Sequence, residues 1–224
     1  MKHLKDNSLR ARNAIKALWA VLIASVLLLA ANYMQYLMLT DITNGYKASE
    51  EELANLDLRN LIVVLIYLTT FVISAVMFIK WFRRAYANIR IFFPNLSYGD
   101  TWTVWTWFVP VVNLYVPYKI MRELHEKTDL LLFRNKIKID VFGRNYLTLW
   151  WTLWIVNIFV GRIVTRIYAK AETISQLTQS SLADICLNIL GIILVPIAIQ
   201  VVRQYAEVEP LLHQIQTDKA EQNT

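Results

Sequence analysis

The sequence predicts an all-α integral membrane bundle, with four transmembrane helices and a proline-broken segment that is re-entrant or interfacial. Of the 224 residues, 56% are hydrophobic and only 18% are charged, whereas soluble domains are about 45–50% apolar and about 25% charged. Four apolar stretches reach the roughly 20 residues that a helix needs to cross a bilayer. Backbone groups in lipid must be paired within their own segment, which favours helices over strands. These observations exclude a soluble enzyme, a disordered chain and a disulfide-rich domain.

The predicted spans lie in one membrane domain over residues 1–205, followed by a cytoplasmic tail at 206–224. The apolar core of the first span is longer than that of a signal peptide, so we expect an uncleaved anchor. Ser49 and Glu52 form a capping-box pattern, which predicts that the second helix begins before its apolar part. The expected spans are 17–39, 61–79, 147–167 and 185–202.

The distribution of Lys and Arg predicts the orientation of these spans. Basic residues crowd the N-terminal tail and the region from Lys80 to Arg144, whereas the loop from Thr40 to Asn60 is rich in Asp and Glu. Cytoplasmic loops carry the excess of Lys and Arg. We therefore expect both termini and the middle region in the cytoplasm, and the acidic loop outside.

The segment 101–121 is apolar enough to be a fifth span, but two features favour a broken helix at the inner interface. Pro110 and Pro117 interrupt a helix here, with Asn113 between them. A crossing would also place the basic stretch that follows, at 122–144, outside the cell. We expect that stretch to be an amphipathic cytoplasmic element on the membrane surface. A true fifth span is the alternative.

Two motifs in the middle of the chain resemble a known family. The stretch WFRRAYANI begins at Trp81, and WFVPVVNLYVPYKIM begins at Trp107. Together they resemble the signature of a bacterial multi-pass membrane family, domain of unknown function 4328, over roughly residues 60–205. Here Ile89 replaces a Leu, and Val116 stands where an Arg often precedes the second proline. The resemblance implies a multi-helix fold in the bacterial inner membrane, and it brings no established activity.

Arg83, Arg84 and Arg90 follow the second span and form a candidate site for anionic lipid together with Asn113. Arginine offers planar, bidentate donors that suit phosphate, and anionic lipids gather at the inner surface. The alternatives are an ordinary positive-inside flank for the arginines and a structural hydrogen-bonding role for Asn113.

A second cluster is expected at the outer ends of the third and fourth spans. Arg162 and Arg166 lie near the end of one span, and Asp184 opens the next at the same depth. We expect a structural ion pair between Asp184 and one of the arginines, since ionisable groups near lipid are usually paired. An ion or proton path is the alternative.

No catalytic motif, metal-ligand cluster or cofactor site is found in the sequence. The histidines lie outside the spans, and no zincin, P-loop or G-x-S-x-G pattern occurs. Nothing indicates nucleic-acid binding. We therefore expect a non-enzymatic scaffold or regulatory subunit that binds membrane lipids, a protein partner or a second copy of itself. A small transporter or channel component is the alternative, followed by a lipid-modifying enzyme.

Overall fold

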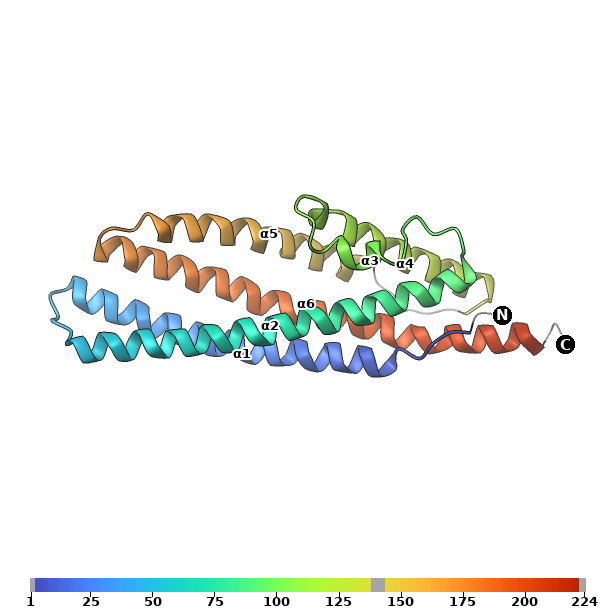
Figure 1. The fold of residues 1–224 in the computed structure, drawn as a ribbon, viewed down its shortest axis with the longest axis horizontal. Helices are drawn as coiled ribbons and strands as arrows, with labels where there is room; N and C mark the ends of the chain where they lie inside the picture. The colour runs from blue at the N-terminus through green and yellow to red at the C-terminus, as the bar shows by residue number, and fades with distance from the viewer. Residues whose placement is uncertain (1–2, 138–143, 222–224) are drawn as a thin grey trace. The chain divides into compact units, whose positions relative to one another are not determined.

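A computed structural model describes residues 3–137 and 144–221 of the chain, and these residues form helices joined by turns and loops (Figure 1). The long helices are α1 (Ser8–Thr43), α2 (Glu50–Phe92), α4 (Val116–Arg134), α5 (Arg144–Ala169) and α6 (Ile174–Glu221). Between α2 and α4 lie the one-turn helix α3 (Trp102–Trp105) and the 3-10 turn η1 (Val112–Leu114). The expected all-α class is confirmed.

Four of these helices are long and apolar enough to span a membrane, within the described part of the chain. They are α1, α2, α5 and α6, and each contains one of the predicted apolar segments. The segment 101–121 adds no such helix. The prediction of four candidate spans with a broken fifth stretch therefore holds.

The chain divides into two compact units. One comprises Ala17–Ile73 and Thr152–Ile197, and we call it the hairpin unit. The other comprises Met1–Lys16, Ser74–Trp151 and Ala198–Thr224, and we call it the α4 unit. The membrane domain at 1–205 and the cytoplasmic tail at 206–224 stay predictions. Residues 206–221 continue α6, and Val208, Leu212 and Ile215 are buried in the α4 unit.

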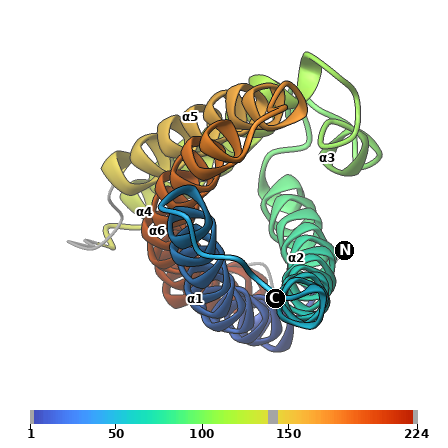
Figure 2. The ribbon, with the colours of Figure 1, turned by 90° about the vertical axis from the view of Figure 1, so that its left-hand side faces the viewer.

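The hairpin unit consists of the turn-side parts of two helical hairpins, α1–α2 and α5–α6, and Figure 2 shows their connecting turns facing the viewer. Within α1–α2, Asn60 donates a hydrogen bond to Gln35 (3.1 Å). The Ser181 hydroxyl of α6 faces the Asn32 carbonyl of α1 (3.5 Å). The absence of a side chain at Gly161 brings α5 close to Leu187 of α6, as small residues do between membrane helices.

The start of α2 confirms the predicted capping box. The Ser49 amide donates to the Glu52 carboxylate (2.8 Å), and the Glu52 amide donates to the Ser49 hydroxyl (3.2 Å). The helix accordingly begins at Glu50, well before the apolar segment. In this way, two backbone N–H groups at the start of the helix, which have no partner within the helix, are hydrogen-bonded.

The two prolines of the broken segment act differently. Pro110 follows the short helix α3 and precedes Val111, whose φ of 67° is rare for a β-branched residue. Pro117 lies in the first turn of α4, where its missing N–H removes no helical bond. The amphipathic helix α4 therefore begins at Val116, before the predicted start at 122. It includes the end of the segment 101–121 and the first part of the stretch 122–144.

Candidate functional site

The second half of α2 is the scaffold of the candidate site in the α4 unit. Trp81, Phe82, Ala85, Tyr86 and Ile89 are fully buried. Their spacing places them on one face of the helix, as residues four apart share a face. Arg83, Arg84 and Arg90 occupy other positions of the same helix, so the helix fixes where they lie.

The predicted lipid-binding arginines have three different environments. Arg83 forms an ion pair with Asp100 of the loop before α3, and its Nε lies 3.1 and 3.0 Å from the two carboxylate oxygens. The hydrogen bond from Arg83 lowers the pKa of Asp100. Arg90 donates to the carbonyl of Tyr98 and lies over the Tyr86 ring, 5.3 Å from its centroid. Two of the three guanidinium groups are thus engaged within the protein.

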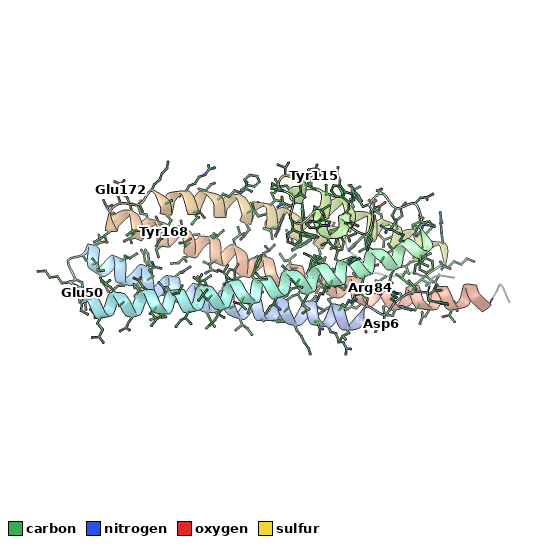
Figure 3. All side chains as sticks on the ribbon, in the orientation of Figure 1. Asp6, Glu50, Arg84, Tyr115, Tyr168 and Glu172 are labelled. Atoms are coloured by element: carbon green, nitrogen blue, oxygen red, sulfur yellow. The ribbon has the colours of Figure 1, made fainter. Side chains whose placement is uncertain are left out.

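Arg84 differs because no hydrogen bond or ion pair is found for it among the described residues. Figure 3 labels it on α2. Its pKa is lowered, first by partial burial and then by the positive charges of Arg10 and Arg83. Arg10 is held nearby, with its Nη1 donating to the Lys80 carbonyl (3.4 Å). We call Arg10, Arg83 and Arg84 the basic face.

Tyr86 joins α2 to α4 through a carboxylate. Its hydroxyl donates to Glu123 (2.6 Å) and accepts from the Tyr98 amide (3.3 Å). The amide and hydroxyl of Ser97 also donate to Glu123, at 3.0 and 2.8 Å. Burial raises the pKa of Glu123, but the hydrogen bonds from Tyr86 and Ser97 together lower it by more. The pKa of Glu123 therefore lies below its ordinary value. This network fixes the loop at 95–100 against the basic face.

Asn88 joins α2 to the N-terminal segment and to α6. Its amide pairs with both backbone groups of Lys5, accepting from the N–H (3.1 Å) and donating to the carbonyl (2.9 Å). The same side chain donates to Glu209 (2.8 Å). Asn7 also donates to Glu209, at 3.2 and 3.0 Å to its two oxygens. Asn7, Asn88 and Glu209 are all buried, so this is a buried polar cluster.

Asn113 does not join these groups in the described structure. It lies on η1, and its backbone N–H bonds to the Val109 carbonyl (3.0 Å), but no hydrogen bond of its side chain is found there. The indole of Trp151 instead donates to the Leu114 carbonyl (3.1 Å). The structural hydrogen-bonding role of Asn113 stays a prediction.

The outer cluster lies in the hairpin unit. Within the described residues, no nitrogen–oxygen contact within 4.0 Å joins Asp184 to Arg162 or Arg166. The guanidinium of Arg162 lies over the ring of Phe159, 5.9 Å from its centroid. The ion pair stays a prediction, and Arg162 has an aromatic neighbour that the sequence did not indicate.

Sequence reasoning missed the acidic partners of this site. Asp100, Glu123 and Glu209 look like ordinary charges, and Asn7 precedes an apolar run. One signal was available, because Tyr86 and Asn88 are polar positions of a motif on an otherwise buried helix face. Buried polar side chains need partners, so carboxylates elsewhere in the chain were the natural candidates. The described residues contain no group of three side chains suited to a metal ion.

The fold and this site define a multi-helix protein whose four long helices can span a membrane and whose polar contacts gather around one motif. The family model described as "Domain of unknown function (DUF4328)" matches residues 44–207. The chain belongs to this family, which confirms the resemblance noted in the two motifs. Neither a curated protein nor a solved structure matches the chain.

Proposed function

We propose that the protein is a non-enzymatic inner-membrane scaffold or regulatory subunit that holds anionic lipid head groups on its basic face. The observation that carries this proposal is the guanidinium of Arg84, which lacks a bonded partner in the described structure and has Arg10 and Arg83 as positive neighbours. Such a concentration of positive charge lowers its free energy by binding an anion.

The chemistry of the three side chains suits a phosphate. A guanidinium group donates two parallel hydrogen bonds to phosphate oxygens. Arg83 has an exposed side chain and an exposed partner, Asp100. Exposed ion pairs contribute about 0–1 kcal/mol, so a phosphate competes with Asp100 at little cost. Arg90 is bound to the loop carbonyl at Tyr98, and its part is to position that loop rather than to bind lipid.

The experiment compares lipid content between variants of equal charge. Arg10→Gln with Arg84→Gln removes two positive charges from the basic face. Lys119→Gln with Arg122→Gln removes two from α4, where both side chains are exposed and Arg122 pairs with Glu126. Each protein is extracted in native nanodiscs, and the phosphatidylglycerol and cardiolipin in the discs are quantified.

We expect the basic-face variant to lose at least half of its bound anionic lipid and the α4 variant to keep it. Equal losses, or none, overturn the proposal and leave the arginines as topology signals. A stoichiometric protein that is lost from the basic-face variant while lipid is unchanged identifies a protein as the occupant.

The orientation is tested separately by cysteine labelling. After Cys186→Ser, single cysteines at Lys136 and at Tyr46 are labelled in intact cells with a membrane-impermeant maleimide. We expect Tyr46→Cys to label and Lys136→Cys to label only after lysis, because Lys and Arg concentrate on the cytoplasmic side. Labelling at position 136 from outside indicates a fifth crossing.

A further inference from the structure

The N-terminal residues Leu4–Asn7 form a strap that docks on α2 and α6 within the α4 unit. The Leu4 amide donates to Gln216 (3.0 Å), and both backbone groups of Lys5 pair with Asn88. Asn7 donates to the Trp81 carbonyl (3.3 Å) as well as to Glu209. Leu4 and Asn7 are buried, whereas Lys5 and Asp6 are exposed. A short segment is thus held mainly by hydrogen bonds of its backbone and of one asparagine.

Glu209 is the carboxylate on which this docking converges. It lies seven residues beyond the apolar segment of α6 and is 5% exposed. No cation forms an ion pair with it among the described residues. The charged and titratable groups around it are Asp6 on the strap, Arg84 on α2, and Tyr205 and His213 on α6. Arg10 of α1 acts on Arg84 rather than on the carboxylate.

A pocket connects this carboxylate with the strap. Its volume is about 290 Å³, and its lining includes Asp6, Asn7 and Ser8 together with Glu209, Pro210 and His213 of α6. The pocket is partly open, and Glu209 is one of the residues that line it. Residues that dock the strap therefore border the pocket that Glu209 lines.

We infer that Glu209 is a proton-binding site that controls the strap, which is docked while Glu209 is protonated and is released when Glu209 ionises. Glu209 is buried, holds the strap through Asn7, and has no bonded cation among the described residues that would offset its negative charge. Control of the strap by Glu209 is independent of lipid binding at the basic face.

The direction of the effect follows from burial. Burial raises the pKa of Glu209 from 4.5 to about 7, and the hydrogen bonds from Asn88 and Asn7 offset only part of this rise. Release of the strap exposes the carboxylate to water and returns its pKa toward the ordinary value. The docked form therefore binds the proton more tightly, and docking weakens as the pH rises toward 7. Between pH 6 and 8 the docking constant is expected to fall about tenfold.

The test measures access to the strap in the full-length protein in nanodiscs, with Cys186→Ser in every variant. Leu4→Cys places a thiol at a buried strap position, and His3→Cys places one at the exposed neighbouring position. The rate of maleimide modification at position 4 is divided by that at position 3, which cancels the ordinary pH dependence of thiols. We expect this ratio to rise about tenfold from pH 6 to 8.

Three further variants decide what causes the rise. Glu209→Gln is expected to abolish the pH dependence. Asn88→Ala is expected to raise the ratio at every pH, because it removes an anchor. It is also expected to steepen the pH dependence, because the Asn88 hydrogen bond lowers the pKa of Glu209. His213→Gln is expected to leave the slope unchanged. A flat ratio with Glu209 present, or an unchanged slope in Glu209→Gln, overturns the inference.

Amide hydrogen exchange of the strap keeps the test decisive if Leu4→Cys itself loosens the strap. The amides of Leu4 and Lys5 are bonded to Gln216 and Asn88, so their protection reports docking without a cysteine in the strap. After correction for intrinsic exchange rates, protection should fall about tenfold between pH 6 and 8. Constant protection over this range excludes control by Glu209.

Discussion

The two halves of α2 have opposite surroundings. In the hairpin unit, residues 61–73 expose most of their large side chains, including Leu61 (55%), Phe71 (49%) and Val72 (59%). In the α4 unit, residues Trp81–Ile89 present a face that is fully buried against other parts of the protein. An exposed apolar surface of this extent is typical of contact with lipid. One helix therefore meets two environments, and only the second half depends on specific protein contacts.

The polar contacts divide in the same way. Around the second half of α2, Asn88 and Tyr86 each bond to groups far away in the sequence. Around the first half, the bond between Asn60 and Gln35 joins two neighbouring helices of one hairpin. Long-range hydrogen bonds fix one arrangement of the chain. The comparison predicts that substitutions in the second half destabilise the fold and that matched substitutions in the first half do not.

The largest expected effect is that of Trp81→Ala. Trp81 is fully buried and packs against Phe78 and Tyr205, with ring centroids 5.4 and 5.9 Å apart. Removing a buried Trp costs about 3–5 kcal/mol. The matched control is Phe71→Ala, expected to cost less than about 1 kcal/mol because lipid contacts the ring before and after unfolding. Unfolding by sodium dodecyl sulfate measures both, and equal losses contradict the comparison.

Asn88→Ala is expected to cost about 2–3 kcal/mol. The change leaves the two Lys5 backbone groups without their partner and removes one of the hydrogen bonds to Glu209. An unsatisfied buried group costs about 1–3 kcal/mol. Asn60→Ala removes an amide from the other half of the helix, and we expect a loss below about 1 kcal/mol. The same unfolding measurement compares the two. A cost at Asn88 no larger than that at Asn60 argues against a special role of the strap contacts.

Glu209→Gln is expected to stabilise the protein at pH 8 and to change little at pH 5. The pKa of Glu209 is raised to about 7 in the folded protein from 4.5, so its contribution to stability is full below about pH 4.5 and is lost as the pH rises through 7. Glutamine carries no charge to bury, and we expect a gain of about 1–2 kcal/mol at pH 8. Thermal unfolding of both proteins across pH measures the gain. A Glu209→Gln protein that is less stable at pH 8 shows that the ionised carboxylate strengthens the cluster.

The features that depend on local pattern were predictable. A run of about 20 apolar residues predicts a spanning helix, and the four runs coincide with α1, α2, α5 and α6. The Ser49–Glu52 pattern predicted the start of α2, because a capping box needs only residues three apart. Position along the chain also indicated that Arg83 and Arg90 lie beside the end of the second span.

The contacts of the candidate site were not predictable in the same way. Asn7 and Glu209 lie 202 residues apart, and Asn88 and Glu209 lie 121 apart. No periodicity relates such residues, since their proximity arises only from helix packing. Arg83 shows the same limit, because its position was evident but its pairing with Asp100 depends on the loop before α3.

The smallest expected effect is that of Arg83→Ala, although Arg83 belongs to the buried half of α2 and makes the clearest ion pair. Its side chain is 54% exposed and that of Asp100 is 41% exposed. Water and salt screen such a pair, so we expect a loss of less than about 1 kcal/mol that shrinks further in 0.5 M salt. Unfolding at low and high salt measures this. A loss as large as that of Asn88→Ala means that the loop at 95–100 depends on Arg83. In that case the exposed contacts of the second half of α2 stabilise the fold as specifically as its buried contacts do.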